Sequence, residues 1–146
     1  MSEKIYYPYH KYKEDMDSIV QYCDENKINH VFGVFRGSLI PAVEISNRLD
    51  IPMSIIKCQL RDGFDEEPSI MYLAKPPIGD RILVIDDIWD TGESIRKIKN
   101  MFSNFNYDIE NIEYFTLFGN EGAGDECQYM WESNYKWIQF WWEKSE

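Results

Sequence analysis

Three aspartates stand close together in the stretch RILVIDDIWDTGESIRKI, which spans residues 81–98. Asp86 and Asp87 are adjacent and follow a run of Ile, Leu and Val, and Asp90 comes three residues later. Carboxylates this close repel one another, so their clustering predicts a ligand that offsets the repulsion. A Mg²⁺ ion, which prefers oxygen ligands, and a polyol, whose hydroxyl groups donate to carboxylates, both meet this requirement.

The residues after the acid pair have the composition of an anion-binding turn. Free backbone N–H groups and the positive end of a helix dipole attract anions where a strand turns into a helix. Glycine lets the backbone approach a phosphate closely, and hydroxyl groups add donors. The segment therefore predicts a phosphorylated, polyhydroxylated ligand, and its candidate contacts are Asp90, Thr91, Gly92, Glu93 and Ser94.

A simpler explanation exists for some of these residues. Asp90 or Thr91 could cap the following helix, with Ser94 completing local hydrogen bonds. One cap does not need three acids, so capping explains the single residues better than it explains the whole constellation.

The elements that must position these residues alternate along the chain. Apolar spacing predicts a series of helices and strands. The helices span 11–26, 38–49 and 92–102, and the strands span 30–35, 53–57, 70–73, 81–85 and 112–118, with an exposed loop over 61–68. This order predicts an α/β fold with a mostly parallel sheet flanked by helices, and 146 residues suit a single domain. Ligands bind such sheets at the carboxyl ends of the strands, where Asp86 and Asp87 are expected.

Composition narrows the choice of partners and compartment. Fifteen Lys and Arg against 26 Asp and Glu leave a net charge of −11, which disfavours nucleic acid. The sequence has no apolar run long enough to span a membrane and no apolar signal core at its start. Three widely spaced cysteines without a CxxC pair predict free thiols. We expect a cytoplasmic protein.

Two motifs resemble those of a known enzyme family. VIDDIWDTGES is similar to the phosphoribosyl pyrophosphate (PRPP) motif of type I phosphoribosyltransferases, in which a strand, two acids and an Asp-Thr-Gly turn precede a helix. VFGVFRGSLIPAVEISNRLDI, residues 31–51, is similar to the family's pyrophosphate loop and the helix after it. By this resemblance Arg36 and Gly37 hold the diphosphate, with Arg36 forking onto phosphate oxygens.

The end of the chain resembles the short bacterial xanthine–guanine (hypoxanthine) phosphoribosyltransferases. TLF at 116–118 and WIQFWWE at 137–143 are similar to their last strand and base-binding hood. The resemblance implies one phosphoribosyltransferase domain over 1–146, with the hood over about 119–146. It also implies that Trp137 stacks on the base and that the backbone of Ile138 reads the edge of the base.

The resemblance implies a reaction in purine salvage. Ribose 5-phosphate passes from PRPP to a purine or purine-like base, with Mg²⁺ as cofactor and release of pyrophosphate. Asp87 is then the metal ligand, Asp86 binds the ribose hydroxyls, and Asp90 is the catalytic base that accepts the proton of purine N7. The family also implies a homo-oligomer.

The sequence departs from the family pattern in three places. Asn120 stands where the purine-specific relatives have a lysine that contacts the base, and it could donate to or accept from a different base. Glu93 replaces a small residue of the phosphate-binding turn. The 58–80 loop is acidic, with Arg61 and Lys75 as its candidate basic contacts to pyrophosphate.

These departures keep a second hypothesis open, in which the protein senses PRPP or a nucleotide with little or no transferase activity. An aspartate-nucleophile phosphatase is a third, but that chemistry needs two aspartates two positions apart, whereas Asp87 and Asp90 are three apart.

Overall fold

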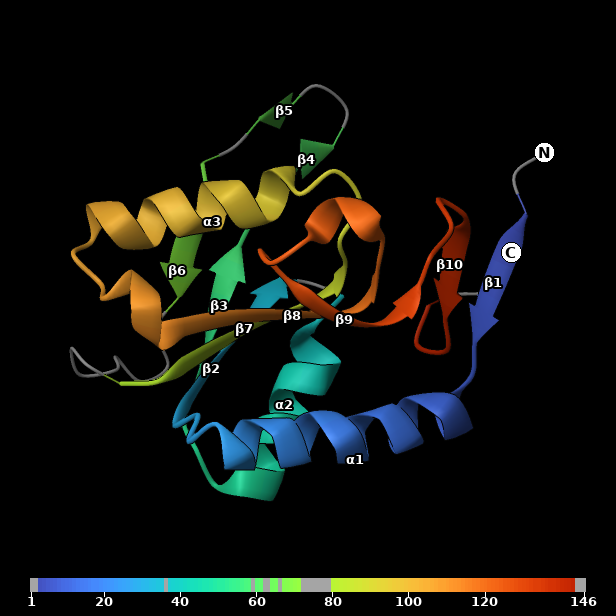
Figure 1. The fold of residues 1–146 in the computed structure, drawn as a ribbon, viewed down its shortest axis with the longest axis horizontal. Helices are drawn as coiled ribbons and strands as arrows, with labels where there is room; N and C mark the ends of the chain where they lie inside the picture. The colour runs from blue at the N-terminus through green and yellow to red at the C-terminus, as the bar shows by residue number, and fades with distance from the viewer. Residues whose placement is uncertain are drawn as a thin grey trace.

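A six-stranded sheet forms the centre of the protein (Figure 1). The computed structural model describes residues 3–35, 37–58, 60–61, 64–65, 67–71 and 80–143, with backbone alone at 60–61 and 64–65. The strand order is β6-β3-β2-β7-β8-β9, and only β6 runs antiparallel to its neighbour. The strands are β2 (His30–Phe35), β3 (Met53–Lys57), β6 (Ser69–Met71), β7 (Ile82–Ile88), β8 (Ile112–Gly119) and β9 (Gln128–Glu132).

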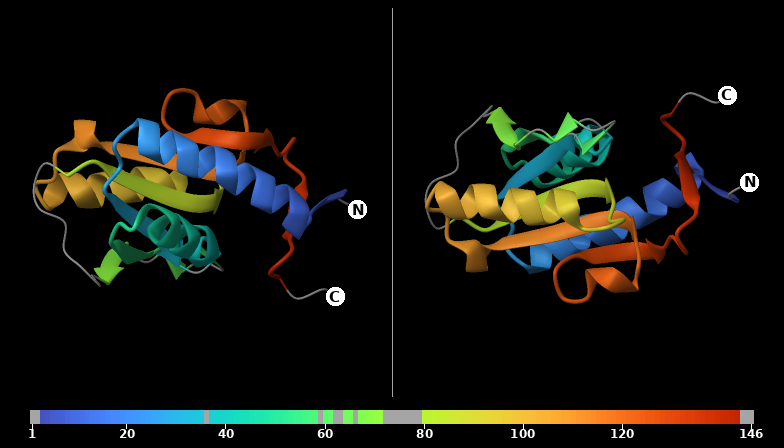
Figure 2. Two further views of the ribbon diagram at one scale, coloured as in Figure 1. Left: turned by 90° about the horizontal axis from the view of Figure 1, so that it is seen from below. Right: turned by 90° about the horizontal axis from the view of Figure 1, so that it is seen from above.

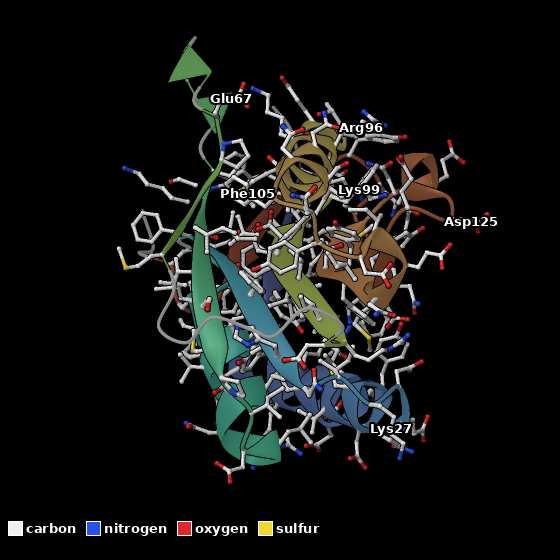
Figure 3. All side chains as sticks on the ribbon, turned by 90° about the vertical axis from the view of Figure 1, so that its left-hand side faces the viewer. Lys27, Glu67, Arg96, Lys99, Phe105 and Asp125 are labelled. Atoms are coloured by element: carbon white, nitrogen blue, oxygen red, sulfur yellow. The ribbon has the colours of Figure 1, made fainter. Side chains whose placement is uncertain are left out.

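Helices cover both faces of this sheet, so the predicted α/β fold is confirmed. Helices α1 (Tyr9–Glu25) and α2 (Leu39–Leu49) lie on one face and α3 (Glu93–Asn104) lies on the other (Figure 1). The end-on view shows Lys27, just after α1, and Phe105, just after α3, on opposite sides of the sheet (Figure 3).

The central strand β7 shows why both faces need a cover. Its side chains alternate between two buried clusters, because successive residues of a strand point to opposite faces. Leu83 and Ile85 belong to the cluster under α1 and α2, whereas Ile82 and Val84 belong to the cluster under α3. A strand that is apolar on both faces is the pattern of a buried parallel sheet.

Strand β7 is longer than the sequence predicts. It continues to Ile88, because β8 pairs with it beyond the apolar run, joining Asp86 to Thr116 and Ile88 to Phe118. The two acids are therefore part of the sheet, and a strand ladder holds their backbone.

The chain ends meet in a second, two-stranded parallel sheet that the sequence did not predict. Strand β1 (Lys4–Tyr7) pairs with β10 (Trp137–Phe140) at one end of the molecule (Figure 2). The segment expected to form the hood is thus divided, because β9 joins the main sheet and β10 joins β1. Two short pieces of the 58–80 loop, β4 (Leu60–Arg61) and β5 (Phe64–Asp65), pair antiparallel.

The connection between β8 and β9 lies beside α3. It contains the 3-10 turn η2 (Glu121–Ala123), and a second 3-10 turn, η1 (Ile109–Asn111), precedes β8. Arg96 and Lys99 of α3 lie on the side of Asp125 in Figure 3, and both form ion pairs with Glu126, at 3.5 and 3.9 Å. Within the part of the chain that the structure describes, no helix is both long and apolar enough to cross a membrane.

Candidate active site

A cavity of about 1070 Å³ opens where β2 and β7 end and α3 begins. Asp86, Asp87 and Gly37 line one part of it, and residues 90–94 line the part next to α3. Trp142 and Glu143, which follow β10, also line it. The carboxyl edge of a parallel sheet is the expected place for a ligand in this class of fold.

The two adjacent acids are held rigidly at the base of this cavity. The backbone N–H of Asp87 donates to Oδ1 of Asp86 at 2.8 Å, and that of Ile88 donates to Oδ1 of Asp87 at 2.8 Å. Burial, together with the charge of Asp87, raises the pKa of Asp86 well above its usual range. Burial also raises the pKa of Asp87. A bound cation, or hydroxyl groups that donate to the carboxylates, would stabilise the charged forms of both acids.

The donor set fits a magnesium ion that arrives with its substrate. Oxygen ligands suit Mg²⁺, which keeps several waters and is commonly bound by one or two carboxylates plus substrate phosphates. Among the described residues no group of three or more His, Cys, Asp or Glu side chains could hold a metal ion. The pair Asp86 and Asp87 therefore fits a shared ion better than a cage made by protein alone.

The turn after β7 presents the start of α3 to the cavity. The helix begins after Gly92, whose φ of 84° is in the left-handed region, and no side chain caps it. The Thr91 hydroxyl accepts only a long hydrogen bond, 3.4 Å, from the N–H of Glu93. Because neither Asp90 nor Thr91 is the N-cap residue, the capping explanation does not account for them, and the first residues of α3 line the cavity.

Glycine is required at two points of the cavity wall. A Cβ at Gly92 would overlap the ring of Trp89, a residue only 1% exposed. A Cβ at Gly37 would overlap the carboxylate of Asp87, so the loop after β2 touches the acids directly. Arg36, the predicted diphosphate contact beside Gly37, lies outside the described residues, as do Lys75 and the side chain of Arg61.

Asn120, the predicted base contact, lies away from the cavity in the structure. Its side chain is 1% exposed and does not line the cavity. The amide nitrogen donates to the carbonyl of Asp90 at 2.8 Å and to that of Trp89 at 3.4 Å, and the amide oxygen accepts from the N–H of Gly122 at 2.9 Å. Asn120 therefore holds the backbone of the turn that carries Asp90.

The two predicted hood contacts, Trp137 and Ile138, also lie away from the cavity. Trp137 is 60% exposed, Ile138 is buried in the core, and neither lines the cavity. The backbone of Ile138 is instead part of the pairing between β10 and β1. The chain turns after Phe140, and this turn brings Trp142 and Glu143 to the cavity.

The sequence itself holds a signal that Trp137 faces outward. In WIQF the period of two places Ile138 and Phe140 on one face, and both are buried, so Trp137 must face outward. The ring of Trp142 stacks on Phe140, with centroids 4.7 Å apart and planes at 14°, which fixes its orientation.

The fold and the site together define a phosphoribosyltransferase. A family model described as the phosphoribosyl transferase domain matches residues 6–145. The chain belongs to this family, as the two motifs predicted. Membership implies PRPP and a base as substrates and a transferase as the class of enzyme.

Solved structures agree with the assignment. A purine phosphoribosyltransferase from Pyrococcus horikoshii is 25% identical, with a TM-score of 0.80 over 98% of this chain and 95% of its own. The xanthine-guanine-hypoxanthine phosphoribosyltransferase of Helicobacter pylori is 17% identical, with a TM-score of 0.72 over 97% and 94%. An orotate phosphoribosyltransferase from Aeropyrum pernix is 22% identical, with a TM-score of 0.62 over 84% and 70%. Proteins named for different bases share this fold, so the fold does not decide the base.

Proposed function

We propose that this protein transfers ribose 5-phosphate from PRPP to a purine or purine-like base and releases pyrophosphate, as a step of purine salvage in the cytoplasm. One observation carries the proposal: a single cavity brings together the acid pair of β7, the uncapped start of α3 and the aromatic end of the hood. The similarity to the purine enzyme of Pyrococcus horikoshii supports a purine rather than a pyrimidine.

In this proposal each part of the cavity has its own task. The hydroxyl groups of the ribose donate to Asp86, and the phosphate of the sugar accepts from backbone N–H groups and hydroxyls of residues 91–94. The loop at Arg36 and Gly37 binds the diphosphate. Asp87 would hold a Mg²⁺ ion, which would supply positive charge to the departing diphosphate.

Asp90 is the proposed catalytic base. It lines the cavity, its side chain is exposed to the ligand space, and Asn120 anchors its carbonyl. As positive charge develops on the ribose, the base nitrogen attacks the anomeric carbon and the diphosphate leaves. The proton lost by the purine then passes to the Asp90 carboxylate.

The test is release of pyrophosphate from PRPP with Mg²⁺ and a panel of purines and pyrimidines. We expect release with at least one purine. Asp90→Asn should keep PRPP affinity and lower turnover by about 10²-fold or more. Asp125→Asn, on the exposed η2 connection, is the matched control and should retain full turnover.

The same assay separates the transferase from the sensor. A sensor would gain thermal stability with PRPP, because a ligand that binds only the folded form raises the melting temperature. It would release no pyrophosphate with any base.

We also propose a homo-oligomer. Tyr6 and Trp137, 63% and 60% exposed, lie on the two strands of the β1–β10 sheet and offer apolar area to a second copy. Light scattering of the purified protein tests this, and a monomer at micromolar concentration would refute it.

A further inference from the structure

Glu143 lines the cavity beside Trp142, just after β10. The acid pair and the turn at residues 90–94 take up the ribose and its phosphate in the proposed function, so the base lies on the side of Trp142 and Glu143. Oε1 of Glu143 accepts from the N–H of Phe140 at 2.9 Å, which ties the side chain to the end of β10. This hydrogen bond fixes the position of the Glu143 carboxylate, and its second oxygen can accept from another donor.

Acidic side chains dominate the described lining of the cavity. Five of the described lining residues are acidic, and none of the described lining residues is Lys, Arg or His. An anionic base on the Glu143 side would meet a like charge, and a carboxylate accepts hydrogen bonds only.

We propose that Glu143 selects the base, and that it favours a neutral base which turns adjacent N–H donors toward the hood. Guanine is the best match, because its ring N1–H and its 2-amino group lie side by side and can both donate to one carboxylate. Hypoxanthine keeps the ring N–H and lacks the amino group. Xanthine carries an oxygen in place of that amino group and loses a proton near neutral pH, and orotate carries a carboxylate. This inference rests on the proposed transferase function and adds the substrate class.

The experiment compares kcat/KM for guanine, hypoxanthine and xanthine in the wild type, in Glu143→Gln and in Glu110→Gln. Glu110 is exposed in η1, at the opposite end of β8 from the cavity, so its variant removes one charge without touching the site. We expect the wild type to prefer guanine over xanthine. The glutamine at 143 should reduce that preference by about tenfold or more, in the range of polar-group discrimination, and the control should leave it unchanged.

Several results would overturn the inference. The guanine-to-xanthine ratio could stay the same in Glu143→Gln, or change equally in both variants, or the wild type could prefer xanthine. Failure of the transferase function gives a different result, namely no pyrophosphate with any base. In that case the thermal shift with guanine and with xanthine decides: a larger shift with guanine, lost in Glu143→Gln, supports base selection, and equal shifts refute it.

Discussion

Replacing Asn120 with alanine distinguishes the anchor seen in the structure from the base contact that the sequence predicts. The side chain is 1% exposed and makes two hydrogen bonds shorter than 3.0 Å, one to the Asp90 carbonyl and one from the Gly122 N–H. Alanine removes both hydrogen bonds, and a hydrogen bond of this kind contributes about 0.5–1.5 kcal/mol to stability. We expect the free energy of unfolding to fall by about 1–3 kcal/mol in total.

The functional consequence follows from where those bonds lie. The Asp90 carbonyl belongs to the turn that enters α3, so a loosened turn should weaken PRPP as well as lower turnover. Chemical denaturation measures the first effect and calorimetric titration with PRPP measures the second. Asn104→Ala is the matched control, because Asn104 is exposed at the end of α3, and its variant should stay within about 0.5 kcal/mol of the wild type.

One pattern of results would refute the anchor. If Asn120→Ala unfolds like the wild type, binds PRPP normally and loses affinity for the base alone, then Asn120 contacts the base and does not anchor the turn.

Three further perturbations test other parts of the site and core. Trp142→Ala should weaken the base by about tenfold or more, as expected for a lost stacking partner, with PRPP affinity intact, whereas Trp137→Ala should change neither; base and PRPP titrations would contradict us if the two variants behaved alike. Gly92→Ala should destabilise the protein by about 2–5 kcal/mol, from its left-handed backbone and from overlap with the indole ring beneath it. Gly124→Ala, at a φ of 51° with open space around its Cβ, should lose only the backbone part, so equal denaturation midpoints for both would remove the overlap argument. Burial lowers the pKa of His30 from 6.5 to about 4, so the unfolded chain binds a proton that the folded protein does not. Stability should therefore fall as the pH drops from 6.5 toward 4, by at most about 1.4 kcal/mol per pH unit, and parallel pH–stability curves for the wild type and His30→Gln would disprove this.

Local sequence was enough for the central strands and for the turn of the site. Strand β7 reads as a buried parallel strand because every residue from Ile82 to Ile85 is apolar, and a strand covered on both faces needs apolar residues on both. The Asp-Thr-Gly turn is recognisable because its chemistry comes from consecutive residues. Residues that are consecutive in a motif are held near one another by the chain itself, so the motif can be recognised without knowing the fold.

The hood was harder to predict, because it depends on contacts between distant parts of the chain. Strand β1 is only four residues long, and its partner β10 is more than 130 residues away, since Lys4 pairs with Trp137. No feature of the sequence KIYY itself indicates that partner. The pairing sets which face of β10 is buried, and so it decides that Trp142, rather than Trp137, reaches the cavity.

Asn120 shows the same division between chemistry and position. From its sequence position after TLF it has the donors and acceptors of a base-reading residue. Only the fold brings the carbonyls of Trp89 and Asp90 within 3.4 and 2.8 Å of its amide nitrogen, and a buried amide must satisfy such partners first.

The amino-acid sequence by itself determined the class of this protein, the acid pair and the turn that enters α3, because those properties belong to neighbouring residues. The tertiary structure decided which aromatic ring and which carboxylate of the hood line the cavity, because the pairing of β10 with β1 sets where the chain turns after Phe140.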